Sequence, residues 1–413
     1  MGARLLITTA GSGASNNLMR SLCAASPSVF LVGCHDDQFI LKNSLAERNY
    51  LVPPAGHPQW ILALCHIVES ERINLILPTT DADVSTLSRA RSRLSGRLFL
   101  PGPMALKTCE DKYRLITLLR AGGVSAPVTY CVTRLDHVGR IFRRLGDPPR
   151  AWCRIRTGAG AMGAISVRGP EQARGWIAYW REMRGVRPTS FVLSEYLPGR
   201  DFGCQSLWKN GRMVLIKTYE RLSYLGTGSQ PVQASSVAAL AKTVCEPRVV
   251  ETCVKAIRLL DAKASGVFSA DLKEDIRGVP CITEINAGRF SSATNIFDLV
   301  GKHNMAATYV RLALGAPITL REEYDVAEDW YMLRDIDNVP RMFDAEEFFD
   351  GIEDVRELGQ RRAGHNRPRE EEAAEWRISR SIRRSVVAGR SSGSRQRRKA
   401  RQPDACFESS ERR

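Results

Sequence analysis

The chain has 413 residues, enough for two or three domains, and 43% of them are hydrophobic and 25% charged, as is typical of globular proteins. No apolar run reaches the roughly 18 to 20 residues that a membrane-spanning helix needs, and the first residues indicate a buried strand rather than a signal peptide. We therefore expect a cytoplasmic protein with no membrane partner.

The formal net charge of +15 is concentrated at the carboxyl end. Residues 361–413 carry 16 Lys and Arg against 7 Asp and Glu, with little apolar content. This composition predicts a basic, disordered and solvated tail. The alternatives are contact with nucleic acid or anionic lipid through the tail, and a basic helix over 370–387, where apolar residues stand near helical spacing. Nucleic acid is otherwise not expected as a partner.

The eleven cysteines are scattered, without a CxxC pair and without a nearby cluster of histidines. Most stand beside apolar residues, as Cys65 does after Leu64 and Cys153 after Trp152. This pattern indicates reduced cysteines packed in a core rather than a disulfide framework. It also lacks the ligand spacing of a structural zinc site.

Strand and helix patterns alternate over the first part of the chain, which predicts a parallel sheet with helices on both faces. A glycine-rich turn, Gly11 to Ser15, follows the first expected strand in the manner of a Rossmann-like domain. Because the third glycine of that motif is missing, a nicotinamide-dependent oxidoreductase is kept only as an alternative. The expected strands are 4–9, 29–33 and 74–77, and the expected helices are 16–25 and 59–69.

Two acids, Asp81 and Asp83, follow the strand expected at 74–77. At the carboxyl end of a parallel strand they can face a ligand crevice. They can equally cap a helix that begins at Val84. The sequence leaves both interpretations open.

After Pro101 the pattern changes to an α+β region on a second sheet. Short strands, a glycine-rich loop and longer strands stand between amphipathic helices, and two neighbouring strands close the region within 266–286. The expected helices are 107–121, 169–183 and 237–264, and the expected longer strands are 190–195, 203–208 and 212–219.

The two strands within 266–286 carry polar side chains in an apolar context. Asp271 ends the first strand pattern, and Glu284 and Asn286 alternate along the second, so the three are expected on one face. Two carboxylates and an amide oxygen make a hard-oxygen site suited to Mg²⁺. The alternative is a pair of solvent-facing acids on a hairpin.

Three further segments carry candidate phosphate or nucleotide contacts. A strand bearing Arg154 leads into a loop with Gly158, Gly160 and Gly163, whose amides can approach phosphates because no Cβ blocks them. The loop lacks the Gly-Lys-Ser/Thr of a P-loop, and a mobile hairpin loop is the alternative. Lys112 stands near a helix start, and an apolar strand ends at Glu195, with Asp201 shortly after.

The order of these segments resembles the ATP-grasp superfamily. Within it, residues 1 to 320 look most like the ATP-binding half of carbamoyl phosphate synthase large subunits and their single-copy relatives, above all in the segment Glu284 to Ser292. The resemblance implies a Rossmann-like pre-ATP-grasp domain at 1–105 and a two-subdomain ATP-grasp domain at 106–325. A packed extension at 326–360 and the tail at 361–413 would follow.

The resemblance also implies a role for each matching residue. Lys112 and Arg154 would contact ATP phosphates, with Arg154 and Arg289 as catalytic residues, and Arg289 would face the transferred phosphate or the substrate carboxylate. The nucleotide site would comprise Lys112, Arg154, Gly158, Gly160, Gly163, Glu195, Tyr196, Leu197 and Asp201, and the metal ligands would be Asp271, Glu284 and Asn286. Arg at 154, and Asp instead of Glu at 201 and 271, depart from the commoner pattern.

The implied function is an ATP-dependent carboxylate–amine ligase that uses Mg²⁺, or Mn²⁺ in its place. It would phosphorylate a substrate carboxylate to an acyl phosphate, which an amine or another nucleophile then attacks. The partners are small carboxylate and amine substrates, a homodimer is allowed, and Ser12, Ser15 and Asp81 are candidates for substrate contact. A catalytically silent ATP-binding regulator or scaffold is the alternative. The absence of a duplicated synthetase half argues against carbamoyl phosphate synthesis itself.

Overall fold

The computed structural model of the protein describes residues 2–25, 29–94, 96–158, 160–225, 237–293, 297–298, 300–334 and 350–356. Within these ranges no helix is long and apolar enough to cross a membrane. The ten cysteines in them are all free thiols. The tail at 361–413 and the helix expected over 370–387 lie outside the described residues, so both remain predictions.

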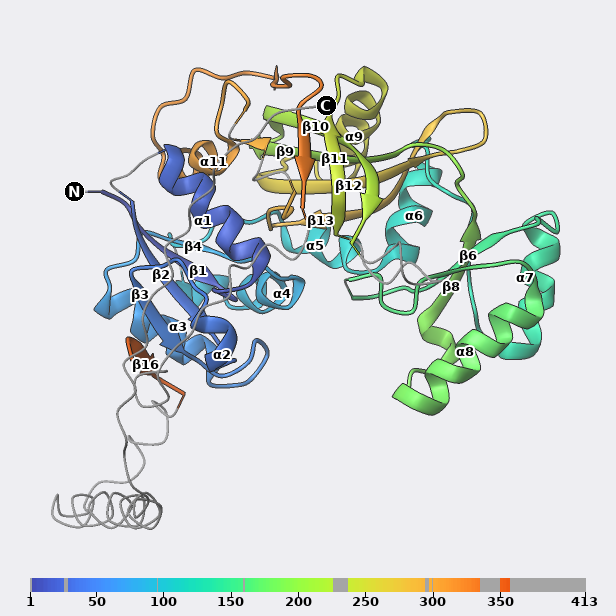
Figure 1. The fold of residues 1–413 in the computed structure, drawn as a ribbon, viewed down its shortest axis with the longest axis horizontal. Coiled ribbons are helices and arrows are strands. Elements are labelled where there is room, and N and C mark those ends of the chain that lie inside the picture. The colour runs from blue at the N-terminus through green and yellow to red at the C-terminus, as the bar shows by residue number, and fades with distance from the viewer. Residues whose placement is uncertain are drawn as a thin grey trace, which may run out of the picture. The chain divides into compact units, whose positions relative to one another are not determined.

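A parallel sheet forms the amino-terminal part of the chain, as the alternating sequence pattern predicts (Figure 1). Its strand order is β16-β3-β2-β1-β4, so the last described strand joins the first sheet. The strands are β1 (Arg4–Thr8), β2 (Phe30–His35), β3 (Arg48–Leu51), β4 (Leu75–Leu77) and β16 (Ile352–Asp354), and the helices are α1 (Gly13–Ala25), α2 (Gln38–Leu41), α3 (Trp60–Ser70) and α4 (Asp81–Arg89).

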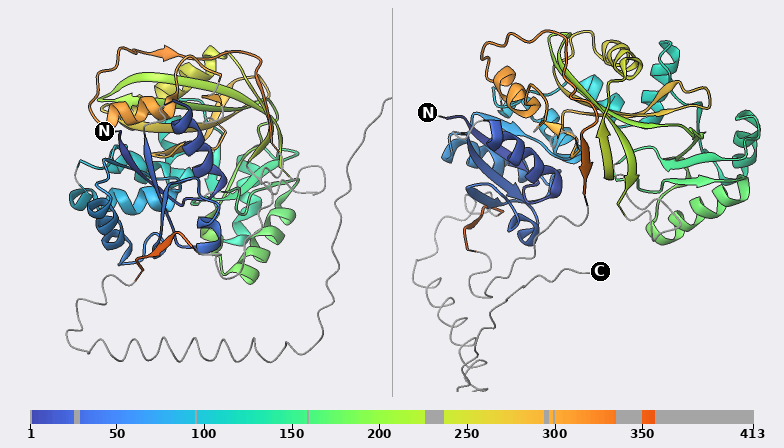
Figure 2. Two further views of the ribbon diagram at one scale, coloured as in Figure 1. Left: turned by 60° about the vertical axis from the view of Figure 1, so that its left-hand side comes forward. Right: turned by 45° about the horizontal axis from the view of Figure 1, so that its top comes forward.

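Helices cover both faces of this sheet (Figure 2). Successive side chains of a strand point to opposite faces, so Leu5 packs with Leu18 of α1, while Leu6 packs with Trp60 and Leu64 of α3. Burial on both faces explains why the strands are continuous apolar runs. Strand β3 escaped prediction because Arg48–Leu51 has only two apolar residues.

A smaller antiparallel sheet follows, with the order β5-β8-β6-β7. Helices α7 and α8 pack on it through Phe142 and Ile177, which share a core with Cys153 and Leu193 (Figure 1). The elements are β5 (Thr129–Cys131), α7 (Val138–Arg144), β6 (Ala151–Ile155), β7 (Ile165–Val167), α8 (Pro170–Arg184) and β8 (Phe191–Glu195).

The largest sheet has the order β13-β12-β9-β10-β11-β15, with β14 also paired to β10. Helices α5, α6 and α9 pack on one face, where Phe268 contributes to the core, and α11 packs on the other, where Val267 does. The elements are α5 (Pro103–Cys109), α6 (Lys112–Ala121), β9 (Asp201–Lys209), β10 (Arg212–Tyr224), β11 (Ala238–Thr243), α9 (Pro247–Leu260), β12 (Gly266–Glu274), β13 (Pro280–Ala287), α11 (Met305–Ala313), β14 (Glu323–Tyr324) and β15 (Tyr331–Leu333).

Two predicted helices are wrong in their extent. The helix expected over 107–121 is two helices, because Asp111 leaves the helical path and caps α6 by accepting hydrogen bonds from the amides of Tyr113 and Arg114. The helix expected over 237–264 begins with strand β11, which pairs with β10 and β15, and becomes helical only at Pro247. Proline fits the first turn of a helix because its missing N–H has no partner there.

Candidate active site

Strands β12 and β13 place Asp271 directly opposite Glu284, and Ser269 opposite Asn286. The prediction that Asp271, Glu284 and Asn286 share one face is therefore confirmed. A register shift after Asp271 leaves Thr283 as the extra residue on β13, and its hydroxyl donates to the Asp271 carbonyl at 3.0 Å. Bulges of this kind re-aim side chains at functional edges of a sheet.

Glu284 lies among cations. Its Oε2 is 3.4 Å from Lys112 Nζ and 3.6 Å from Arg154 Nη1. Burial by itself raises the pKa of the Glu284 carboxyl, but the charges of Lys112 and Arg154 outweigh it and hold that pKa well below its usual range. The carboxylate is therefore ionised at neutral pH.

Asp271 has a different neighbour. The Arg221 guanidinium of β10 forms an ion pair with Asp271 and a second one with Asp201 at 2.8 Å. Burial is the main influence on the pKa of the Asp271 carboxyl and raises it; the Arg221 charge opposes this, and the nearby Glu284 charge adds to it. The two facing carboxyls thus have pKa values shifted apart, an arrangement found at functional sites.

Lys112 is held beside the glycine loop by local structure. Asp111, the N-cap of α6, forms an isolated β-bridge with Thr157, and the Lys112 amide donates to the Arg156 carbonyl at 2.9 Å. Asp111 is also ion-paired with Arg156. The Lys112 ammonium then donates to the Gly158 carbonyl at 2.6 Å. The lysine therefore belongs to the site rather than to a solvated helix start.

Arg154 projects from β6 and is 8% exposed. Its Nη2 donates to the Thr283 carbonyl at 2.6 Å. Within the described residues its buried Nε has no hydrogen-bond partner. A buried donor without an acceptor is costly, so this nitrogen is a candidate for contact with an anionic ligand.

The glycine loop follows directly after β6. Gly158 and Gly160 have φ angles of +97° and +74°; a Cβ at Gly158 would make an ordinary contact with Met162 Cε at 3.6 Å, and a Cβ at Gly160 would meet open space among the described residues. Gly163, with φ of +67°, leaves no room for a Cβ, which would meet Ile155 at 2.8 Å. Its carbonyl accepts a hydrogen bond from Trp176 Nε1 at 3.0 Å. Gly163 therefore anchors the loop, whereas an added Cβ would be accommodated without a clash at Gly158 and Gly160.

The strand end at Glu195 and the start of β9 supply the remaining predicted nucleotide contacts. The Glu195 carboxylate accepts from the Val128 amide at 3.2 Å, the Tyr196 ring lies 5.7 Å from the Arg150 guanidinium, and Leu197 is buried. Asp201 accepts from the hydroxyl of Tyr224 in addition to its Arg221 ion pair.

These segments enclose a cavity of about 500 Å³. The structure brings together most of the residues expected to bind nucleotide, together with two of the three expected metal ligands. Gly163, Asn286 and Arg289 do not line the cavity. The predicted residues that do are Lys112, Arg154, Gly158, Gly160, Glu195, Tyr196, Leu197, Asp201, Asp271 and Glu284.

Arg289 instead pairs with the amino-terminal region. Its guanidinium is ion-paired with Asp81 and donates to Asn286 Oδ1 at 2.7 Å. The sequence left open whether Asp81 and Asp83 face a ligand or cap a helix. Asp83 caps the helix: it forms a capping box with Thr80 at the start of α4. Thus one acid caps the helix and the other holds Arg289.

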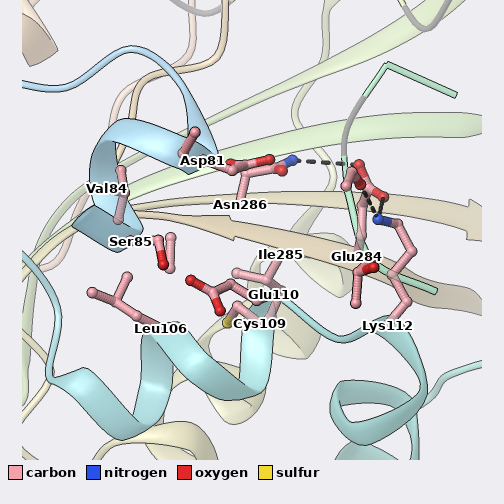
Figure 3. Close-up of a pocket in the computed structure, with 14 residues that line it drawn as sticks. Asp81, Val84, Ser85, Leu106, Cys109, Glu110, Lys112, Glu284, Ile285 and Asn286 are labelled. Atoms are coloured by element: carbon pink, nitrogen blue, oxygen red, sulfur yellow. Dashed lines mark hydrogen bonds and ion pairs between the residues drawn. The ribbon is translucent and has the colours of Figure 1, made fainter. Parts of the chain in front are cut away.

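A second cavity of about 260 Å³ lies between α4, the end of α5 and β13 (Figure 3). It shares Lys112, Gly158 and Glu284 with the larger cavity and is bounded elsewhere by Asp81 and Glu110. Ser12 and Ser15 line neither cavity; their hydroxyls lie 3.0 Å apart at the start of α1, and Ser15 is fully buried.

No protein-family model and no curated protein matches the sequence, but solved structures do. L-amino acid ligase from Bacillus licheniformis aligns with a TM-score of 0.57 at 12% identity, over 76% of this chain and 74% of that one. The biotin carboxylase domain of Hydrogenobacter thermophilus 2-oxoglutarate carboxylase aligns with a TM-score of 0.61 at 14% identity, over 80% of this chain and 73% of that one. N5-carboxyaminoimidazole synthetase from Staphylococcus aureus aligns with a TM-score of 0.59 at 11% identity, over 79% of this chain and 80% of that one.

The chain has the ATP-grasp fold. This confirms the predicted fold class for the described residues. The limits expected for the separate domains, at 105, 325 and 360, are not tested by the likeness and remain predictions.

Among the residues that line the larger cavity, the cationic Arg221 and Lys273 and the phenol of Tyr224 escaped prediction. The strand that carries Arg221 was expected to end at Tyr219, so the arginine fell outside it. One signal was present, since acids such as Asp201 and Asp271 in apolar strands require a cationic partner. The sequence does not show which of many arginines provides it.

Proposed function

We propose that the chain is an ATP-dependent carboxylate–amine ligase. It binds Mg-ATP in the larger cavity and transfers the terminal phosphoryl group to a substrate carboxylate. An amine then attacks the acyl phosphate, and ADP and phosphate are released. The observation that carries this proposal is the pair of facing carboxylates, Asp271 and Glu284, on the wall of a cavity that also contains Lys112, Arg154 and Arg221.

The residues present fit Mg²⁺ and a triphosphate. Carboxylate oxygens are the ligands Mg²⁺ prefers, and Asp271 and Glu284 present them from neighbouring strands, with Asn286 two positions further along. Within the described residues, no three His, Cys, Asp or Glu side chains converge into a metal site. That suits Mg²⁺, which is usually bound by one or two carboxylates together with substrate phosphates. Bound there, Mg²⁺ would neutralise phosphate charge.

The chain's own groups supply positioning and charge. Lys112 and Arg154 bind phosphate oxygens, Arg154 through the Nε that has no hydrogen-bond partner among the described residues. Their positive charges stabilise the negative charge that spreads over the transferred phosphoryl group. Glu195, Tyr196 and Leu197 line the adenine and Asp201 takes the ribose. Gly158 and Gly160 give the loop the freedom to close over the phosphates, and closure excludes water from the acyl phosphate.

Arg289 acts on the substrate side. It lies on the segment that follows β13, between Asp81 of the amino-terminal region and the expected metal ligand Asn286. From there its guanidinium holds the substrate carboxylate or the transferred phosphoryl group. Asp81 fixes the guanidinium in place through the ion pair, which makes Asp81 a positioning residue in this account.

The names of the structural relatives support the reaction type. One is an amino acid ligase and another a synthetase, and the biotin carboxylase domain is described in complex with MgADP and bicarbonate. The finer relationship to carbamoyl phosphate synthase subunits and the cytoplasmic location rest on the sequence, and we keep both as part of the proposal.

One observation favours a second candidate, a catalytically silent ATP-binding regulator. Asp271 is ion-paired with Arg221, Glu284 with Arg154, and Asn286 Oδ1 accepts from Arg289, so all three expected metal ligands already have guanidinium partners. In a silent protein these arginines would replace the metal. In an active ligase they move aside, or bind phosphate, when Mg-ATP enters.

Hydroxylamine trapping separates the two functions. It converts an acyl phosphate to a stable hydroxamate, so the assay identifies the activated carboxylate without knowledge of the amine. We expect hydroxamate and ADP to form from Mg-ATP with at least one member of a panel of amino acids and simple carboxylates. ATP binding without hydroxamate from any of them would support the silent regulator instead.

A further inference from the structure

We propose that the buried side chain of Gln205 is a positioning residue for Arg289. Together with Ser269 it fixes the main chain that carries Arg289, and so it sets where the guanidinium meets the substrate carboxylate or the transferred phosphoryl group. This role rests on the proposed function, because Arg289 is assigned to the substrate side there. Gln205 lines neither cavity, so it acts on the reaction only through the residue that it holds.

The main chain around Arg289 lies just beyond the largest sheet. Strand β13 ends at Ala287, and the last main-chain hydrogen bond to β12 comes from the Gly288 amide, at 2.8 Å. Gly288 has a φ of +87°, so the chain leaves the strand conformation at this point. Among the described residues, no backbone–backbone hydrogen bond holds residues 289–291. Side chains therefore have to satisfy and fix this segment.

Two polar side chains of the sheet hold the segment where the main-chain ladder ends. Gln205 Oε1 accepts a hydrogen bond from the Ser291 amide at 2.8 Å. It also accepts one from the Ser269 hydroxyl at 2.9 Å, and that hydroxyl lies 3.4 Å from the Arg289 carbonyl. Gln205 is fully buried and Ser269 is 5% exposed. A polar network that is buried and satisfied makes the segment it holds rigid.

The pairing of the strands brings these side chains into one row. Gln205 on β9 lies opposite Ser269 on β12, and Ser269 lies opposite Asn286 on β13. Residues directly opposite each other share a face of the sheet, so the row leads from Gln205 to Asn286. Asn286 Oδ1 accepts a hydrogen bond from the Arg289 guanidinium at 2.7 Å. The row therefore holds Arg289 at two points, its main chain and its guanidinium.

The chemistry of the Gln205 amide suits this role. Its Oε1 faces two donors, while its Nε2 lies 3.2 Å from Met305 Sδ, a weak acceptor. The reverse orientation would place the NH₂ group against the Ser291 amide, donor against donor. An apolar side chain of the same length would leave that buried amide without an acceptor, which is costly. The segment therefore requires an acceptor at position 205.

A purely structural role is the alternative, and β9 contains a matched control for it. Ser206 is 1% exposed and accepts a hydrogen bond from Trp208 Nε1 at 2.8 Å. Adjacent residues of a strand point to opposite faces, so Ser206 points away from the segment that carries Arg289. Gln205→Met, which keeps an unbranched side chain, and Ser206→Ala each remove the acceptor of one buried N–H. Both should lose stability to a similar extent in thermal unfolding.

Hydrogen–deuterium exchange of the full chain tests whether Gln205 holds the segment. It is measured by mass spectrometry on peptides that cover residues 288–293. We expect exchange in these peptides to be about tenfold faster in Gln205→Met than in the wild type, because the Ser291 amide loses its acceptor. Ser206→Ala should exchange there as the wild type does. Equal exchange in Gln205→Met and the wild type would overturn the inference.

The hydroxylamine assay, run with a carboxylate that the panel identifies, tests the effect on the substrate. Gln205→Met should lower kcat/KM for the carboxylate about tenfold and leave KM for ATP unchanged, whereas Ser206→Ala should change neither. In an Arg289→Ala background, Gln205→Met should have no further effect, because Gln205 acts through Arg289. An equal fall in both backgrounds would contradict the positioning role. Ser269→Ala should give a smaller fall of about threefold, and it serves as the test if Gln205→Met does not fold.

The outcomes separate this role from the proposed function. A wild type that forms no hydroxamate overturns the proposed function and the role of Gln205 within it. A wild type that forms hydroxamate, beside unchanged kinetics or unchanged exchange in Gln205→Met, overturns the role of Gln205 alone.

Discussion

Arg221 joins two acids that lie on different strands: its guanidinium is ion-paired with Asp201 at the start of β9 and with Asp271 on β12. The arginine side chain is 9% exposed, and the two acids are 18% and 27% exposed. A buried cation between two acids ties the neighbouring strands together at the floor of the larger cavity. Its loss leaves the two carboxylates close together without the guanidinium that lies between them.

Replacing Arg221 by Met should therefore lower the free energy of unfolding by about 2 kcal/mol, since the acids are only partly buried. Arg221→Lys should lower the free energy of unfolding less, because lysine keeps the charge but lacks the planar guanidinium that contacts both carboxylates. Urea unfolding measures both. Arg212→Met, at an exposed position of the same strand, is the matched control. Equal midpoints for Arg221→Met and Arg212→Met would show that the ion pairs add nothing to stability.

The two loop glycines provide a second matched comparison. Gly160→Ala and Gly163→Ala both place a Cβ at positive φ, which costs about 1 kcal/mol. Only at Gly163 does the new Cβ also meet Ile155, at 2.8 Å, so that variant should lose about 2 kcal/mol in total. Thermal unfolding of the two variants measures the difference. If Gly160→Ala were the less stable protein, the assignment of Gly163 as the anchor of the loop would be wrong.

Glu71 gives the amino-terminal sheet a pH-dependent stability. Burial raises the pKa of its carboxyl, but hydrogen bonds from Tyr50 at 2.6 Å and Arg48 at 2.7 Å, with the ion pair to Arg4, lower it overall. A lowered native pKa stabilises the fold above the unfolded value of roughly 4.3, and this contribution is lost as pH falls through the native pKa.

Urea unfolding at pH 7 and at pH 3 tests this contribution. At pH 7 the Glu71→Gln variant should have a lower free energy of unfolding than the wild type. At pH 3 the difference between the two proteins should be smaller. The exposed neighbour Glu69→Gln should leave the pH dependence as it is in the wild type. A constant gap between Glu71→Gln and the wild type at both pH values would contradict the assignment.

The ion pair between Asp81 and Arg289 should affect one substrate and not the other. Asp81→Asn removes this ion pair and leaves the hydrogen bond from the Arg289 guanidinium to Asn286, so kcat/KM for the carboxylate should fall about tenfold while KM for ATP stays the same. Asp81→Glu, which restores the charge, should recover part of the loss. A parallel rise in both KM values would indicate a general change in structure rather than a positioning role.

The sequence predicts those parts of the site that depend on local pattern. Period-two alternation placed Glu284 and Asn286 on one face, and continuous apolar runs predicted the buried parallel strands. It does not predict the partners of these residues, because a pair such as Asp81 and Arg289 is separated by 208 positions and meets only through tertiary packing.

The failed helix predictions have the same origin. The local sequence pattern predicts a helix over residues 238–243, but hydrogen bonding to β10 and β15 makes these residues a strand. In the helix expected over 107–121, the side chain of Asp111 competes with the backbone for amide hydrogens, which breaks the helix and aims Lys112 at the loop. The residue that interrupts the predicted element is thus the one that positions a site residue.

Calorimetric titration of a non-hydrolysable ATP analogue, with Mg²⁺ and with a chelator, tests the proposed Mg-ATP site most directly. We predict Mg²⁺-dependent binding to the wild type and to Arg212→Met, and binding at least about tenfold weaker to Glu284→Gln, which keeps the shape of the side chain and removes its charge. Equal affinity of Glu284→Gln and the wild type would contradict the metal site. Binding of NADH in place of the ATP analogue would contradict both the ATP site and the ligase function.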